Sequence, residues 1–158
     1  MTLNIPALER VAAWLEAGAP ESANHGLKFD MGDTLCVTLS KDATADNWCG
    51  TTCCIAGAAI AFERPDYVAM NIRSSAALWG DDEEGDEVDV LDPARDLLGL
   101  TEDQADTLFI PWNCDRSDQQ EAVPAPWESS ISPAWAARTI RHLIATGEVD
   151  WKATKVTP

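Results

Sequence analysis

Apolar residues near the start of the chain recur at the spacing of an α-helix. They share one face of such a helix at Leu8, Val11, Ala12 and Leu15. Asn4 can cap the start of this helix, and Gly18 can end it. The pattern therefore predicts a helix over residues 4–18.

A second amphipathic segment lies near the other end of the chain. Ser132 can cap it, Pro133 suits its first turn and Gly147 can end it. Its apolar positions are Ala136, Ile140, Leu143 and Ile144. We expect a helix here, followed by a short extended tail at residues 149–151.

The segment 51–62, TTCCIAGAAIAF, is apolar all the way round rather than along one stripe. A helix of this kind is enclosed by other elements. Thr51 can cap it, and Gly57 inside it costs about 1 kcal/mol relative to alanine. The pattern predicts that this helix lies buried at the centre of the fold.

Two shorter helices are predicted next to each other. The first has Asp92 as its cap and ends at Gly99, and the second starts with Thr101 and Gln104 in capping-box spacing. Such a corner also outlines a helix-turn-helix, whose second helix needs Lys or Arg to read DNA. Residues 101–109 contain neither, which excludes that function.

Strand character is confined to residues 27–31 and 34–39, which Gly32 and Asp33 separate, so a β-hairpin at 27–39 is predicted. Residues 80–91 and 113–131 have the composition of surface loops, the first strongly acidic. The expected fold is mostly α, with α+β possible. It is a single domain over residues 1–158, compact around the helix at 51–62.

The composition is that of a folded protein. The chain has 158 residues, 46% of them hydrophobic, and seven tryptophans. It shows no secretory signal pattern and no apolar run of about 18 residues, and its five cysteines are an odd number. We therefore expect a cytoplasmic protein without a membrane segment, and its oligomeric state stays open.

Negative charge is concentrated in one stretch. Of the formal net charge of −16, residues 81–128 carry −14, with sixteen Asp or Glu against Arg95 and Arg116. The candidate binding residues in this stretch are Asp81, Asp82, Glu83, Glu84, Asp86, Glu87, Asp89, Asp92, Asp96, Glu102, Asp103 and Asp106. They lack the spacing of a calcium-binding loop.

This stretch has two interpretations. It can be a solvated surface that keeps the protein soluble. It can also resemble the charge of a nucleic-acid backbone and so attract the Lys/Arg grooves of nucleic-acid-binding proteins. Direct binding to DNA or RNA is disfavoured by the same charge.

The cysteines at 49–54 allow a catalytic interpretation. If Thr51 caps a helix, Cys53 and Cys54 lie in its first turn, where the helix dipole lowers the pKa of a thiol. A base is also required, yet His25 lies in a predicted loop and His142 on a polar helix face. Buried structural cysteines are the favoured interpretation, and a cysteine-dependent enzyme using Cys53 or Cys49 is the alternative.

The sequence predicts neither a metal site nor a cofactor. The possible metal ligands are Cys36, Cys49, Cys53, Cys54, Cys114, His25 and His142. No Cys-x-x-Cys pair occurs among them, and adjacent cysteines seldom both bind one zinc ion.

Three stretches, WCGTTCCIAGAA, LLGLTEDQADTLF and AARTIRHLIATGEVDW, resemble small uncharacterised proteins of bacteriophages and mobile elements. The resemblance spans about residues 49–62 and 95–151 and implies expression in a bacterial cytoplasm, but no activity. Small acidic proteins in that setting include anti-CRISPR proteins that imitate nucleic acid. Our leading hypothesis is an inhibitor that blocks a basic surface of a host defence complex. A phage accessory or virion-assembly protein is a further alternative.

Overall fold

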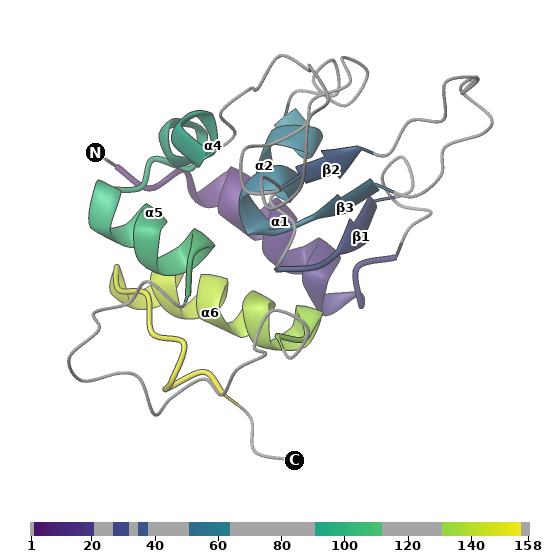
Figure 1. The fold of residues 1–158 in the computed structure, drawn as a ribbon. Coiled ribbons are helices and arrows are strands. Elements are labelled where there is room, and N and C mark those ends of the chain that lie inside the picture. Colours follow the sequence, from purple (N-terminus) through teal and green to yellow (C-terminus); the bar gives the residue numbers. More distant parts are fainter. Residues whose placement is uncertain are drawn as a thin grey trace, which may run out of the picture.

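A computed structural model describes residues 2–20, 27–31, 35–37, 51–63, 91–111 and 131–155, and the structural statements below concern these residues. The fold is mostly helical, as predicted (Figure 1). Its elements are α1 (Ile5–Glu16), β1 (Leu27–Phe29), β2 (Leu35–Val37), β3 (Thr51–Cys53), α2 (Ile55–Glu63), α4 (Leu91–Leu98), α5 (Glu102–Phe109) and α6 (Pro133–Thr146).

The two terminal helices begin at the residues that their capping signals predict. The side chain of Asn4 accepts a hydrogen bond from the amide of Ala7 at the start of α1. The hydroxyl of Ser132 accepts one from the amide of Trp135 at the start of α6. Gly147 ends α6 in the left-handed conformation, with φ of +78°. These caps satisfy amides and carbonyls that have no partner within the helix.

The helices α1 and α6 pack against each other along their apolar faces. Leu8 and Leu15 from α1 and Ile140 and Leu143 from α6 are fully buried. Ile144, also predicted to be buried, is only partly so. Arg141 on α6 forms a two-bond ion pair with Glu16 on α1, at 2.9 and 3.0 Å, beside this contact.

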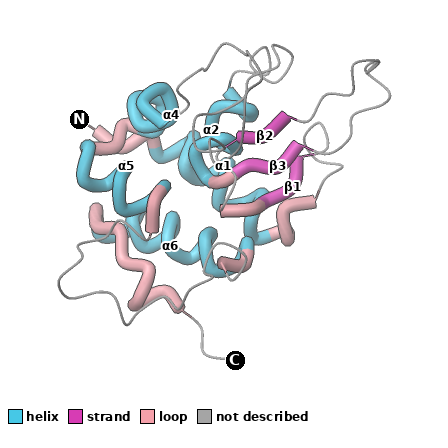
Figure 2. Tube along the Cα trace, in the orientation of Figure 1, coloured by secondary structure: helices cyan, strands magenta, loops and turns pink. Residues whose placement is uncertain are grey.

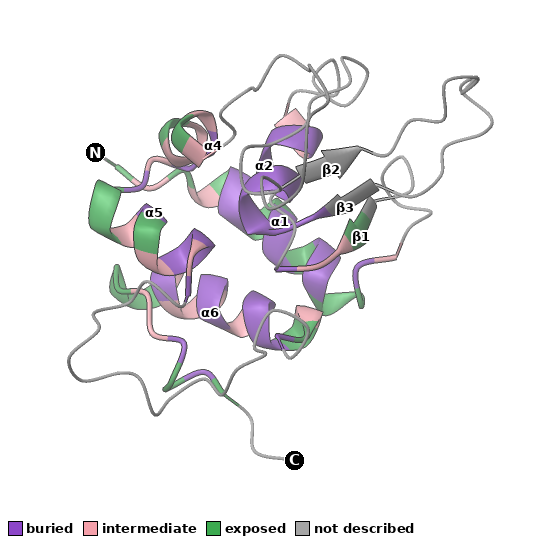
Figure 3. Ribbon diagram, in the orientation of Figure 1, coloured by how far each residue is buried: buried purple, intermediate pink, exposed green. Residues whose placement is uncertain are grey.

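The helix α2 is buried on all sides, which confirms the central helix predicted from its apolar composition. All of its residues from Ile55 to Ala61 are buried, including Gly57. It contacts α1, α4, α5 and all three strands. Figure 3 shows this buried helix among the other elements.

The predicted start of the central helix at Thr51 is wrong, because Thr51–Cys53 forms the strand β3. The helix begins after Cys54, whose carbonyl accepts the amide of Ala58 at 2.9 Å. Threonine favours extended backbone. As a strand, β3 also forms hydrogen bonds to a neighbouring strand on each side. These bonds would be absent if the same residues formed one more turn of helix.

The three strands form one small sheet in the order β1-β3-β2, which lies at one side of the helices (Figure 2). β1 runs parallel to β3 with Leu27 opposite Thr51, and β2 runs antiparallel with Leu35 opposite Cys53. Both predicted strand regions are therefore extended, but the predicted hairpin at 27–39 is wrong. The two strands pair with β3 between them instead of with each other.

The helices α4 and α5 form the predicted corner. α4 begins at Leu91, so Asp92 lies in its first turn instead of capping it as predicted. α5 has the predicted capping box: Gln104 accepts from the amide of Thr101 at 2.9 Å and donates its own amide to the Thr101 hydroxyl at 3.2 Å. Gly99, with φ of +67°, makes the turn between them.

The residues after α6 fold back over α5 and α6 in place of the extended tail predicted at 149–151. Trp151 is buried, and its indole Nε1 donates to the carbonyl of Thr107 on α5 at 2.8 Å. The indole of Trp135 donates to the carbonyl of Trp151 at 2.9 Å. The two rings meet edge to face with centroids 5.8 Å apart. This contact attaches the corner of α4 and α5 to α6.

Candidate functional site: an acidic surface on two short helices

Five of the twelve predicted acidic residues are described by the structure, and all five are exposed on α4 and α5. They are Asp92, Asp96, Glu102, Asp103 and Asp106. We call them the acidic corner. The other seven, from Asp81 to Asp89, lie outside the described residues. So does the predicted loop 80–91 apart from Leu91, the first residue of α4, and the predicted loop 113–131 apart from the buried Ile131.

The local sequence explains why these carboxylates face outward. Each of the two helices has one apolar side, which buries Ala94 and Leu98 in α4 and Ala105 and Leu108 in α5. The charged residues occupy the remaining positions of each helix. Burial of one face therefore displays the carboxylates together on the other.

One cation lies within the acidic corner. The guanidinium of Arg95 contacts Asp92 at 2.6 Å and Asp96 at 2.9 Å. The hydrogen bond to Asp96 and the neighbouring carboxylates raise the pKa of Arg95 above its usual value. With five carboxylates and this single arginine between residues 91 and 111, the corner keeps a net charge of −4.

The carboxylates of α5 are not neutralised in this way. Within the described part of the chain, Glu102, Asp103 and Asp106 form no ion pair. Glu102 and Asp106 are four residues apart and share one side of the helix. Like charges at this spacing repel each other. The negative potential of the corner is therefore strongest over α5.

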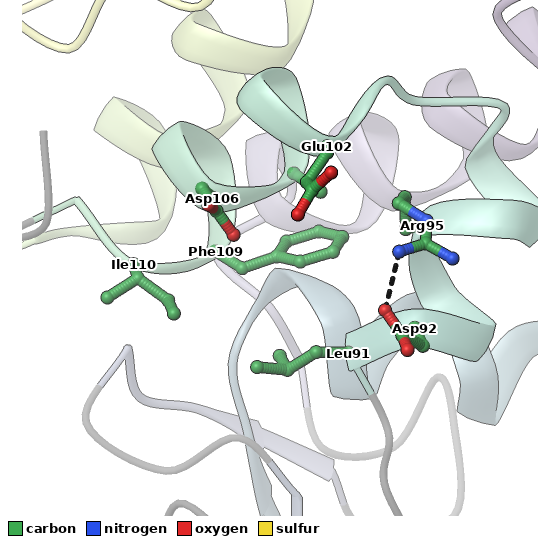
Figure 4. Close-up of a pocket in the computed structure, with 8 residues that line it drawn as sticks. Leu91, Asp92, Arg95, Glu102, Asp106, Phe109 and Ile110 are labelled. Carbon is green, nitrogen blue, oxygen red and sulfur yellow. Dashed lines mark hydrogen bonds and ion pairs between the residues drawn. The ribbon is translucent and has the colours of Figure 1, made fainter. Parts of the chain in front are cut away.

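A small cavity lies between α4 and α5 within the acidic corner. Its volume is about 80 Å³, and we call it the corner groove. Its apolar lining comes from Leu91, Ala105, Phe109 and Ile110, and its charged lining from Asp92, Arg95, Glu102 and Asp106. Figure 4 shows the carboxylates of Glu102 and Asp106 beside the ring of Phe109, with Arg95 turned toward Asp92.

The corner groove limits what this surface can hold. Its volume exceeds the roughly 30 Å³ of one water molecule, but pockets for cofactors and drug-sized ligands measure about 300–1,000 Å³. No group of three or more metal-binding side chains occurs in the segments that the structure describes. The surface is suited to attracting cationic groups of another molecule.

The structure changes the interpretation of the cysteines. Cys53 ends β3 with 0% exposure, so the predicted position in a first helical turn is wrong for this thiol. Cys54 directly precedes α2 and is 2% exposed. Cys49 and Cys114 and the side chain of Cys36 lie outside the described residues. Both described thiols are shielded from solvent, as a structural role requires.

Of the two histidines that were considered as a base for these thiols, the structure describes only His142. His25 lies outside the described residues. His142 lies on the partly exposed side of α6, where its backbone carbonyl accepts a hydrogen bond from the Thr146 hydroxyl at 2.8 Å. Its neighbours Arg138 and Arg141 are engaged with the Thr154 carbonyl and with Glu16. The predicted polar surroundings of His142 are confirmed.

Two features of the site escaped the sequence analysis. The first is the ion pairing of Arg95, for which the three-residue spacing from Asp92 was an available signal. The second is the corner groove, because Leu91 and Ile110 lie at the ends of two different helices and only the fold brings them together.

In the described residues no helix has the length and apolar character needed to cross a membrane. No family model, curated protein or solved structure matches this chain. The physical properties of the acidic corner therefore provide the basis for a functional proposal.

Proposed function

We propose that this protein is an acidic inhibitor of the phage type. It binds a basic, nucleic-acid-binding surface of a host defence complex and blocks it. The observation that carries the proposal is the acidic corner, where five exposed carboxylates on α4 and α5 are offset by a single arginine. The setting in a phage-infected bacterial cytoplasm rests on the sequence resemblance described above.

Electrostatics favours a basic partner over other classes of target. A nucleic-acid duplex carries one negative charge per 1.7 Å or so of its axis, and proteins that bind it present rows of Lys and Arg. A surface with dense negative charge attracts the same rows and speeds the encounter. Residues 81–89 add seven further carboxylates next to the acidic corner in the sequence.

Helices serve this role better than a disordered acidic tail. Carboxylates on α4 and α5 are held by a buried apolar face, by the capping box of Thr101 and by the contact of Trp151 with Thr107. Binding to a fixed array of charges then costs little conformational entropy. Because the described cysteines are buried, thiol chemistry at Cys53 has less support than this non-enzymatic role.

The test is affinity capture from a bacterial lysate, with nuclease treatment to remove bridging nucleic acid, followed by identification of the bound proteins. We expect a nucleic-acid-binding protein or ribonucleoprotein that is released as salt is raised, because screening weakens charge contacts. Purified protein should then displace labelled nucleic acid from that partner.

The matched comparison uses a variant in which Asp82, Glu83, Glu84 and Asp86 and, in the acidic corner, Glu102, Asp103 and Asp106 are changed to Asn or Gln. We expect this variant to capture less partner and to displace nucleic acid poorly. Full affinity of the variant with an unchanged salt dependence would overturn the proposal, as would a partner that binds no nucleic acid.

A further inference from the structure

The corner groove combines two properties that seldom occur together on a surface dominated by charge. Its floor is apolar, with Phe109 and Ala105 largely buried and Leu91 and Ile110 partly exposed. Its rim carries the carboxylates of Asp92, Glu102 and Asp106. A purely solubilising surface needs only the rim.

We propose that the corner groove receives one lysine or arginine side chain of the basic partner. This inference rests on the proposed function and adds a defined anchoring point to it. The occupant follows from complementarity. Lys and Arg bury an aliphatic stem along apolar surface while their charged head stays at a polar edge. The groove offers both parts within about 80 Å³, which is too small for a cofactor.

The cationic head fits between Glu102 and Asp106. These carboxylates lie one helical turn apart on the same side of α5, and neither forms an ion pair with another described residue. A cation placed between them replaces repulsion with two attractions. Charge-assisted hydrogen bonds of this kind are among the stronger ones in proteins, and the charged head keeps its contact with water at the polar edge.

Arg95 is not itself the cation that lies between Glu102 and Asp106. Its guanidinium is held on its own helix by Asp92 and Asp96, at 2.6 and 2.9 Å. It lies at the α4 side of the groove, where Glu102 also attracts it, but it forms no ion pair with either Glu102 or Asp106 (Figure 4). It also repels a second cation at that side, which favours one anchored side chain in one orientation.

The first experiment uses isotope-labelled protein and pentalysine as the probe, followed by nuclear magnetic resonance. We expect the methyl signals of Leu91 and Ile110 to shift and to show contacts to lysine methylene protons. Pentalysine acetylated on every side chain should cause neither change, because it keeps the stem and loses the charge. The same titration with pentaarginine compares the affinity of the groove for arginine with its affinity for lysine. Shifts confined to exposed carboxylates, without methylene contacts, would overturn the proposal.

The second experiment compares two double variants with the same change in charge. E102Q/D106N removes the two groove carboxylates on α5, and D103N/E148Q removes two exposed carboxylates that do not line the groove. We expect pentalysine affinity to fall about tenfold in the first variant and about twofold or less in the second. Equal losses would show that only overall charge matters. The unmodified protein in the first experiment keeps the test valid if either variant folds poorly.

The two proposals fail in different ways. If E102Q/D106N and D103N/E148Q capture the basic partner equally, the groove is no anchor while the inhibitory role stands. If pentalysine occupies the groove but the captured partner does not bind nucleic acid, the inhibitory role fails while the cation site stands.

Discussion

The carbonyl oxygen of Thr2 occupies the space that a Cβ atom at position 99 would need. Gly99 also has φ of +67°, and the adjacent carbonyl of Leu98 accepts the amide of Asn4 at 2.9 Å. The turn between α4 and α5 is thus packed directly on the backbone that leads into α1. The acidic corner is held in place by this contact with the start of the chain.

We expect Gly99→Ala to destabilise the fold strongly. A left-handed conformation costs a residue with a Cβ atom about 1–2 kcal/mol, and the clash with Thr2 adds to this because a backbone atom must move. The free energy of unfolding, measured by chemical denaturation, gives the size of the effect.

Gly147→Ala is the matched control. Gly147 has a similar φ of +78°, but a Cβ atom there would meet nothing within 4 Å. Gly147→Ala should therefore lower the free energy of unfolding only by the conformational cost of about 1–2 kcal/mol. If Gly99→Ala were no more damaging than Gly147→Ala, the close contact at Thr2 would not contribute to stability.

The elements that the sequence predicted best are those whose signals are local. Asn4, Ser132 and the pair Thr101 and Gln104 each cap the helix that they were predicted to cap. A cap satisfies amides within four residues, so its sequence pattern is sufficient evidence. The strand β3 depends on pairing with β1 and β2, whose residues lie 14 or more positions before their partners in the sequence. No local sequence pattern predicts such pairing. The apolar residues that follow β3 instead led to the prediction of a longer helix.

The features of the candidate site also fall into two groups, those visible in the sequence and those that depend on the fold. Charge is visible in the sequence, and the exposure of Asp96 and Asp103 follows from the apolar periodicity of their helices. The partial neutralisation by Arg95 and the groove beside Phe109 depend on how α4 and α5 lie against each other. These features determine which carboxylates are available to a partner, and only the fold reveals them.

Cys53 and Cys54 should react slowly with thiol reagents in the native protein. Their exposed fractions of 0% and 2% leave no route for a reagent until the structure opens. Labelling followed by peptide mass spectrometry assigns the rate to each position. Rapid native modification at Cys53 would support the enzymatic alternative.

Substitutions at Cys53 give a second measure of its role. Cys53→Ser places a hydroxyl in the buried core and should lower the free energy of unfolding by about 1–3 kcal/mol. Cys53→Ala should be milder and should leave partner binding intact. Loss of partner binding in a folded Cys53→Ala protein would contradict a purely structural cysteine.

The ion pair between Glu16 and Arg141 should make the contact of α1 with α6 sensitive to acid. The hydrogen bond from Arg141 lowers the pKa of Glu16 in the folded protein. The stabilisation is therefore fully present above the pKa of Glu16 in the unfolded chain and is lost as pH falls through the lower folded value. Because the side chains of Arg141 and Glu16 keep 40% and 48% of their surface exposed, solvent screens the pair and the effect should be small.

Denaturation of the unmodified protein and of Glu16→Gln as a function of pH measures this contribution. The difference in stability between them should be present at neutral pH and disappear in acid below the folded pKa of Glu16. Raising salt should also reduce it. A difference that persists in strong acid would show that Glu16 acts through packing instead of charge.

Asp106 occupies a position that the stability of its own helix does not favour. It lies in the last turn of α5, near the negative end of the helix dipole, and four residues after Glu102. Asp106→Lys reverses both interactions, since Glu followed by Lys at this spacing is attractive. We expect the free energy of unfolding to rise by about 1 kcal/mol at low salt.

Asp103→Lys makes the same change in charge at the opposite end of α5. Asp103 lies in the first turn, where the helix dipole favours a carboxylate. The free energy of unfolding of this variant should therefore fall by a few tenths of a kcal/mol. Both variants should bind the basic partner less well, but only Asp106→Lys should bind less well while becoming more stable. That combination would mean that the carboxylate beside the corner groove is retained for binding at a cost to the fold. If Asp106→Lys instead destabilised the protein or left partner binding unchanged, Asp106 would be only one more solvated charge.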